Sequence, residues 1–180
     1  EGRSLNRIKE FHWGHLYQHI FSDVTKNAVA LFMVELLSHC LKQPEENTAL
    51  FQFTEDCLVQ LDEAPPAITA NLSLFFALHL THFFGVSPRL TSLEGGIIYF
   101  DLIESVFSIA PPLHEQFIEG KRAQACADIL RARQPAELQE VRLNQEIRRQ
   151  LLQTIERYYQ LHIQDFRPLK TLPILAEVLS

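Results

Sequence analysis

The stretch Asn71-Leu-Ser-Leu-Phe-Phe-Ala-Leu-His-Leu-Thr-His-Phe-Phe84, followed by Gly85, decides the fold class of this chain. It has no charged residue, and its apolar side chains would cover nearly the whole circumference of a helix. A helix that is apolar on all sides is normally enclosed by other helices. Asn71 suits the first cap of such a helix, and Gly85 with Pro88 just beyond it is a stop signal. We therefore predict an all-α domain, a compact helical bundle around this buried central helix.

The same stretch has to be weighed as a membrane span, because no charge occurs between Ala64 and Pro88. Its polar residues argue against that interpretation, as does its length, which is short for a span. Neither flank carries the Lys or Arg residues that orient membrane helices. We expect no membrane contact.

Apolar residues with a period of about 3.6 predict further helices on both sides of the central one. They are expected at residues 23–42, 46–62, 121–132, 142–163 and 172–179, with a short helix at 111–119. Short links between the first helices indicate antiparallel neighbours. We expect Leu31 to pack inward from the first helix. From the second we expect Phe51 to pack inward while the acidic residues face solvent.

Residues 97–107 differ from the rest of the chain. Apolar runs at 97–100 and 106–107 flank a polar turn, a pattern that predicts a small β-hairpin appended to the bundle. Asp101 and Glu104 are expected to accept hydrogen bonds from backbone N–H groups of the turn. Gly95-Gly96, just before, lacks the Lys and Ser or Thr of a phosphate-binding loop.

The 180 residues suffice for one domain, and 47% of them are hydrophobic, so the chain can bury a large core without metals or disulfides. The net charge of −6 is unevenly distributed. Residues 44–87 contain no Lys or Arg and six carboxylates, whereas residues 121–160 contain eight basic and five acidic side chains. A protein that binds a long phosphate backbone by itself is usually basic overall. Any nucleic-acid contact should therefore be confined to a patch.

We find no motif for catalysis, a metal or a cofactor. The cysteines, scattered and odd in number, indicate buried thiols in a reducing cytosol rather than disulfides or zinc; they are Cys40, Cys57 and Cys126. Three histidines, His12, His15 and His19, have a spacing that would place them near one face of a helix. We interpret them as ordinary packing residues more than as a metal site. His79 and His82 on the central helix are expected to bond a carbonyl or carboxylate, but they remain the candidates for an enzyme site.

Several phrases, in their order and spacing, resemble the C-terminal part of the RecO family of DNA repair proteins, in particular its Bacteroidetes branch. They extend over nearly the whole chain, at residues 26–37 (KNAVALFMVELL), 50–53 (LFQF), 61–62 (LD), 71–76 (NLSLFF), 84–88 (FGVSP), 99–102 (YFDL) and 169–175 (LKTLPIL).

The resemblance implies a non-enzymatic, cytoplasmic recombination mediator. Such proteins pair with RecR, bind the acidic tail of the single-stranded DNA-binding protein, anneal strands and assist RecA loading. The family's N-terminal OB-fold binds much of the single-stranded DNA, so residues 1–20 would be the lead-in from that missing domain and residues 21–180 the C-terminal helical domain. Many members carry a four-cysteine zinc module after the central helix. Residues 86–99 here contain no cysteine, so we expect no zinc module.

In some family members a basic residue near the start of the central helix receives the terminal carboxylate of the partner tail, but residues 67–86 here contain no Lys or Arg. The basic residues of the second half of the chain are therefore the candidates for contact with the partner tail or with nucleic acid. The candidates are Lys121, Arg122, Arg131, Arg133, Arg142, Arg148 and Arg149. Alternatively, these side chains form an ordinary solvated face. Two other functions stay open: an all-helical enzyme or small-ligand domain that uses His79 and His82, and a plain dimerisation scaffold.

Overall fold

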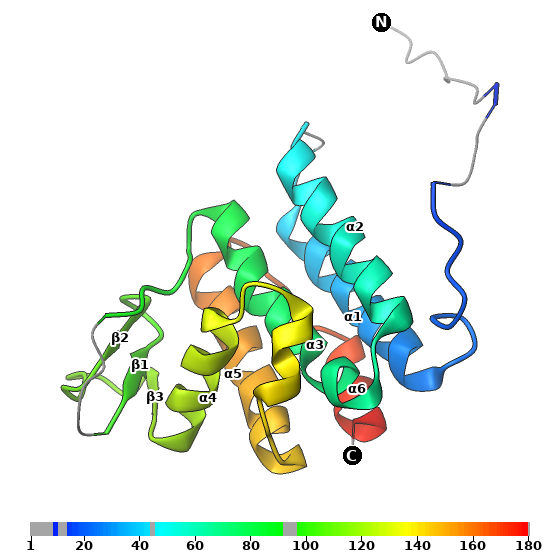
Figure 1. Cartoon of the computed structure of the whole chain (residues 1–180). Coiled ribbons are helices and arrows are strands. Elements are labelled where there is room, and N and C mark those ends of the chain that lie inside the picture. Colours follow the sequence, from blue (N-terminus) through cyan, green and yellow to red (C-terminus); the bar gives the residue numbers. More distant parts are fainter. Residues whose placement is uncertain (1–8, 11–13, 44–45, 92–96, 180) are drawn as a thin grey trace, which may run out of the picture.

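The computed structural model describes residues 9–10, 14–43, 46–91 and 97–179, and this part of the chain is mostly helical with one small antiparallel sheet (Figure 1). The α-helices are α1 (Val24–Cys40), α2 (Thr48–Glu63), α3 (Pro66–Leu80), α4 (Lys121–Arg131), α5 (Gln145–His162) and α6 (Thr171–Val178). Two 3-10 helices, η1 (Thr81–Phe84) and η2 (Pro135–Glu140), follow α3 and α4. The strands are β1 (Tyr99–Asp101), β2 (Val106–Ser108) and β3 (Phe117–Glu119).

The charge-free stretch forms α3 and η1, but the helix begins at Pro66 instead of just after Asn71. Pro66 takes the first helical position, where its fixed φ is already helical and its missing N–H is not needed. Asn71 is therefore not a cap. It lies inside α3, 2% exposed, and its Nδ2 donates to the carbonyl of Val141 at 2.7 Å. Gly85 ends η1 in the left-handed region at φ 69°, which confirms the predicted stop.

The helix α3 packs against α1, α2, α4, α5 and η2. Its length and composition, together with η1, would suffice to cross a membrane, but 67% of the most apolar window is buried within the fold. Burial on that scale is what a core helix of a folded domain shows. In Figure 1 α3 lies in the middle of the helices, between the α1–α2 pair and the α4–α5 pair.

The α1–α2 pair shows that two of our side-chain predictions were wrong. Leu31 is 54% exposed, because α1 turns Val29, Phe32 and Leu36 to the core instead. Phe51, predicted to point inward, is 64% exposed on α2.

Asp62, at the end of α2, is also placed differently from our prediction, since it is buried rather than solvated. Its carboxylate accepts the backbone N–H groups of Gln18, His19 and Ile20 at 2.7 to 2.8 Å. Burial alone would raise the pKa of Asp62, but these bonds lower it to about 2. The ammonium of Lys26 donates to the Asp62 carbonyl at 2.6 Å. Asp62 thus fixes the lead-in segment onto the core.

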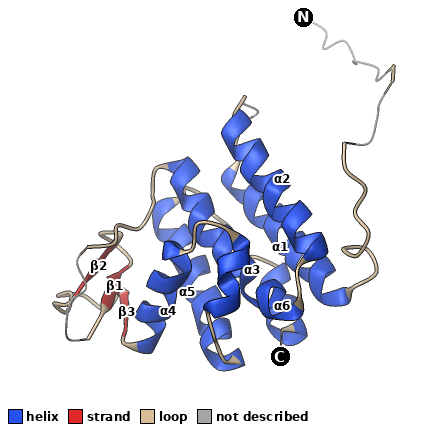
Figure 2. Ribbon diagram, viewed as in Figure 1, coloured by secondary structure: helices blue, strands red, loops and turns tan. Residues whose placement is uncertain are grey.

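The predicted hairpin is confirmed, but it belongs to a three-stranded sheet with the order β2-β1-β3, so the domain is not purely α-helical (Figure 2). The short helix predicted at 111–119 is wrong: its last residues form β3, paired antiparallel with β1. Pro111 and Pro112 offer few backbone donors for a helix. As expected, Asp101 accepts from the turn, at the N–H groups of Ile103 and Glu104.

Candidate functional site

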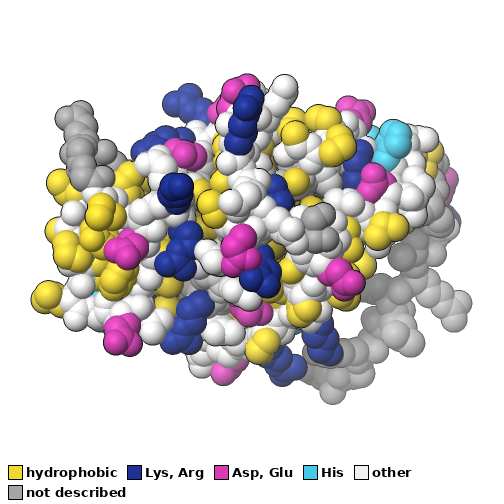
Figure 3. Space-filling view, turned by 90° about the horizontal axis from the view of Figure 1, so that it is seen from below, with side chains coloured by type: hydrophobic (Ala, Val, Ile, Leu, Met, Phe, Trp, Pro, Cys, Tyr) yellow, Lys and Arg dark blue, Asp and Glu magenta, His cyan; other side chains and the backbone are white. Residues whose placement is uncertain are grey.

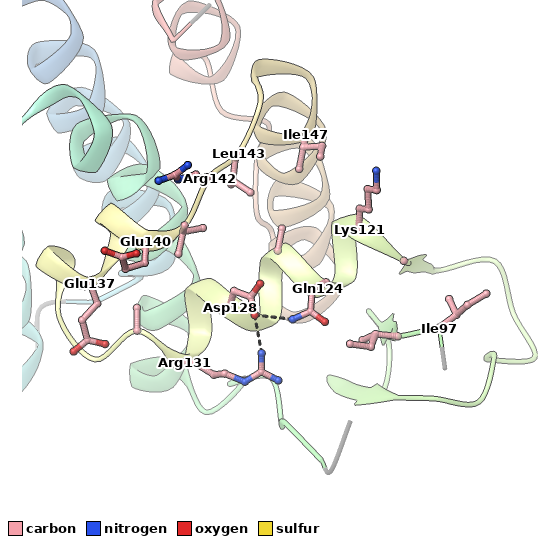
Figure 4. A pocket seen from close by; sticks show the side chains of 15 residues that line it. Ile97, Lys121, Gln124, Asp128, Arg131, Glu137, Glu140, Arg142, Leu143 and Ile147 are labelled. Atoms are coloured by element: carbon pink, nitrogen blue, oxygen red, sulfur yellow. Dashed lines mark hydrogen bonds and ion pairs between the residues drawn. The ribbon is translucent and has the colours of Figure 1, made fainter. Parts of the chain in front are cut away.

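A groove of about 890 Å³ lies where α4, η2 and the start of α5 meet. One face of α4 forms its first wall, because residues three or four apart along a helix share a face. The segment from η2 to α5 forms the opposite wall, and the residues before β1 close one end (Figure 4). The apolar lining comes from Ile97, Ile98, Ala125, Ala132, Val141, Leu143 and Ile147.

Two cations in this groove are unpaired. Lys121 stands at the first position of α4, and Arg142 projects from the segment between η2 and α5 on the other wall (Figure 4). Neither side chain makes a hydrogen bond or ion pair with any residue that the structure describes. No acidic residue occupies the first turn of α4, where the helix dipole already favours anions. Each cation is therefore available to an incoming negative group.

The acidic residues of the groove are mostly engaged with the protein itself. Asp128 receives hydrogen bonds from Arg131 at 2.7 Å and from Gln124 at 2.6 Å, so the Arg131 charge is used internally. Glu137 accepts the backbone N–H of Arg133 at 3.1 Å. Among the acids that line the groove in the described part of the chain, Glu140 alone makes no such bond. With Asp128 and Arg131 paired, Lys121 and Arg142 balance the charges of Glu137 and Glu140, so the described lining is close to neutral within a protein of negative net charge.

Arg148 has a different position from the solvated one that the sequence suggested. It is half-buried, and its guanidinium donates to Asn71 Oδ1 at 3.2 Å and to the carbonyls of Leu143 at 3.1 Å and Leu179 at 3.3 Å. Burial lowers the pKa of Arg148. Together with the bond from Asn71 to Val141, the network joins α3, the wall of the groove, α5 and the end of α6. Arg148 holds the groove in place rather than lining it.

The structure brings only some of the predicted basic residues together. Lys121, Arg131 and Arg142 line the groove. Arg122, Arg133 and Arg149 are not among its lining residues, and Arg149 pairs with Glu146 at 2.6 Å on the exposed side of α5. The face on which α4 and α5 begin carries Lys and Arg side chains beside apolar patches, with acidic residues scattered among them (Figure 3).

The remaining groove residues were missed at the sequence level. The apolar positions Ile97, Leu143 and Ile147 were predicted only as strand or core residues, because the groove depends on how η2 folds back on α4. One signal was present: Lys121, Gln124, Asp128 and Arg131 recur at helical spacing and define a polar face of α4.

The histidine alternative is not supported by the geometry. His79 is partly buried, and its Nε2 lies 3.4 Å from the carbonyl oxygen of Ile129, as expected for a packing histidine. Burial lowers its pKa. His82 is exposed on η1 and contacts the edge of the Phe83 ring. Neither histidine lines the groove described above. Of the other candidates, His12 and the Gly95-Gly96 pair lie outside the described residues.

A serine–histidine pair occurs where α5 meets the sheet, but its hydrogen bonds are those of a structural contact. Ser105 Oγ lies 3.3 Å from His162 Nε2, which is also 2.7 Å from the carbonyl of Leu102. A carbonyl can only accept, so Nε2 carries the proton and cannot remove one from Ser105. The Ser105 hydroxyl also lies 2.6 Å from the hydroxyl of Tyr158, which donates its one proton to the carbonyl of Val86, so Ser105 is held by structural partners.

No group of three or more potential metal ligands occurs among the described residues. The three cysteines are all buried, as predicted, and burial raises the pKa of each thiol to about 12. Such thiols are poor ligands and poor nucleophiles at neutral pH.

Comparison with known proteins gives consistent matches. The family model described as "Recombination protein O C terminal" matches residues 21–93. DNA repair protein RecO of Bacteroides fragilis is 32% identical over 97% of this chain and 72% of its own length. The protein of the same name from Porphyromonas gingivalis is 31% identical over 97% of this chain and 71% of its own length. The one from Christiangramia forsetii is 29% identical over 98% of this chain and 72% of its own length. No solved structure matched this chain.

Proposed function

Because this chain belongs to the RecO family of DNA repair proteins, we propose that it acts as a recombination mediator by binding partners rather than by catalysis. Its partners in this proposal are a RecR-like protein, the C-terminal tail of the single-stranded DNA-binding protein and, secondarily, single-stranded DNA. Its place of action is the cytoplasm, at the nucleoid during repair. Strand annealing and RecA loading are the activities that it would assist.

We further propose that the groove between α4 and α5 receives the partner tail. The observation that carries this proposal is the pair of unpaired cations, Lys121 and Arg142, on opposite walls of an apolar groove. A tail that combines acidic residues, apolar side chains and a free terminal carboxylate needs both features. Arginine and lysine bind carboxylates through charge-assisted hydrogen bonds, and the apolar lining buries the hydrophobic residues.

Single-stranded DNA is the second ligand in this proposal, and the negative net charge of the chain limits how much of its surface a strand can contact. A strand that crossed the acidic α2 region would be repelled, so DNA contact in this proposal is confined to the Lys and Arg side chains on the mixed-charge face in Figure 3. Such contact should be weak and strongly reduced by salt.

Fluorescence anisotropy of a labelled tail peptide from a Bacteroidetes single-stranded DNA-binding protein tests the proposal. We expect the double variant Lys121→Ala/Arg142→Ala to bind about 25-fold more weakly, since a partly exposed charge contact contributes about 1 kcal/mol, or about fivefold. The matched control Arg149→Ala/Arg157→Ala removes the same charge outside the groove. Equal losses for both double variants would show that the peptide responds only to overall charge.

A further inference from the structure

A second groove, of about 540 Å³, lies on the opposite, acidic part of the molecule between α1 and α2. Its lining comes from the end of α1 with Leu41 just after it, from α2 as far as Leu58 with the two residues before it, and from the lead-in residue Tyr17. The apolar part consists of Leu37, Leu41, Leu50, Phe51 and Leu58. It is far in sequence from Lys121 and Arg142 and shares no lining residue with the first groove.

Two of these apolar lining side chains are exposed to solvent. Phe51 is 64% exposed and Leu41 38%. Val34, which precedes Leu37 by one turn of α1, is 57% exposed and extends the surface along the helix. Scattered apolar residues on a surface need no explanation, but several around one groove mark a place where another molecule binds.

The charges around this groove all have one sign. Glu46 and Glu55 line it, both exposed, and no Lys or Arg lines it among the residues that the structure describes. Residues 44–87 of the sequence contain no basic residue at all. The nearest cation along the chain is Lys42, whose ammonium lies 3.4 Å from the carbonyl of Asp165, in the turn that follows α5. The pKa of Tyr17, which lines the groove, is raised by burial and by Glu55 and Asp62, in keeping with a negative potential.

We infer that this α1–α2 groove is a docking site for a cationic, amphipathic segment of a partner protein. The partner's apolar side chains would pack against Leu41 and Phe51, while its Lys or Arg residues would meet Glu46 and Glu55. An amphipathic helix in a groove is a common mode of peptide recognition, and complementary charge fixes its orientation and speeds its association. The inference does not depend on the function proposed for the first groove, whose described lining has as many basic as acidic side chains.

The test uses the whole 180-residue chain and three labelled peptides of equal length. The first is an amphipathic peptide with Leu at helical spacing and Lys elsewhere. The second replaces every Lys by Glu, and the third has the composition of the first in scrambled order. We expect the chain to bind the first at least tenfold more tightly than either of the others, because it alone supplies both the apolar stripe and the positive charge.

Variants then locate the site. Glu46→Lys/Glu55→Lys should weaken binding of the Lys peptide about 25-fold, and Phe51→Ala about tenfold. The matched control Asp56→Lys/Glu63→Lys makes the same change of charge on α2 outside the groove and should weaken binding less than threefold. Thermal melts verify that each variant is folded, which is expected because Phe51 and the four carboxylates are exposed.

Three results would overturn the inference. Equal losses for the two charge-reversed variants, or equal binding of the scrambled peptide, would mean that attraction is only non-specific. Light scattering that shows a dimer of wild-type chain, lost in Phe51→Ala, would assign the groove to a second copy of this chain. If a folded chain bound none of the three peptides, a cationic amphipathic helix would not be the ligand of the α1–α2 groove.

Discussion

Replacing Arg148 should destabilise the domain without acting through the partner site. In Arg148→Ala three acceptors lose their donor: Asn71 Oδ1 and the carbonyls of Leu143 and Leu179. Asn71 is 2% exposed, so its oxygen stays buried and unpaired at a cost of about 1–3 kcal/mol. The two carbonyls can be partly hydrated because Arg148 is only half-buried, and they add about 0.5 kcal/mol each. We therefore expect a loss of about 2–4 kcal/mol in the free energy of unfolding.

Urea denaturation followed by circular dichroism measures this loss, and a domain of this size should melt roughly 5–15 °C lower. Arg148→Lys should lose nearly as much, because an ammonium lacks the planar fork that reaches three acceptors. The neighbouring Arg149→Ala, which breaks only an exposed pair with Glu146, should cost less than about 1 kcal/mol. If Arg148→Ala were no more destabilising than Arg149→Ala, the network would not hold the fold as argued.

Three further predictions concern the attachments of the core. Asp62→Asn should lower the free energy of unfolding by about 2–4 kcal/mol at neutral pH, because charge-assisted bonds to three backbone N–H groups are weakened. The pKa of Asp62 lies below its ordinary 3.8, so its contribution to stability is present above about pH 4 and is lost as the pH falls toward 2. The stability difference between wild type and variant, measured by denaturant titration from pH 7 to pH 2, should therefore shrink between pH 4 and pH 2. Glu35→Ala removes the carboxylate that accepts the N–H groups of Lys170 at 2.9 Å and Thr171 at 2.8 Å at the start of α6. We expect a loss of about 1–2 kcal/mol in the free energy of unfolding, with faster amide hydrogen exchange in α6 and unchanged exchange in α4. An equal change of exchange rate in both helices would contradict this. The thiols should react with an aromatic disulfide reagent at pH 8 only on unfolding, and rapid labelling of the folded chain would show that they are accessible.

Features that depend on a few neighbouring residues were predictable from the sequence. The charge-free stretch indicated a core helix, and Gly85 could end it because a left-handed residue is needed there. The hairpin followed from two apolar runs around a turn, and Asp101 followed from the tendency of aspartate to accept turn N–H groups. Each of these conclusions required only the spacing of residues within about fifteen positions.

Features that depend on distant partners were not predictable. Asp62 resembles a solvated acid at a helix end, and only the arrival of the lead-in at residues 18–20 makes it a buried anchor. Arg148 resembles the exposed Arg149 beside it, and the difference comes from Asn71, 77 positions away. The strand β3 was mistaken for a helix because three residues are too few to show a period, while their pairing with β1 is set by the sheet. The groove itself required the position of η2 on α4.

The central claim, that the α4–α5 groove binds a terminal carboxylate, is tested most directly by a double-mutant cycle. Wild-type chain and Arg142→Ala are each titrated with the tail peptide carrying a free carboxylate and with its C-terminal amide. If Arg142 meets that carboxylate, the amide should weaken binding to wild type about fivefold more than to Arg142→Ala, a coupling of about 1 kcal/mol. Additive effects, with the amide costing the same affinity in both proteins, would contradict the claim that this groove receives the end of the tail.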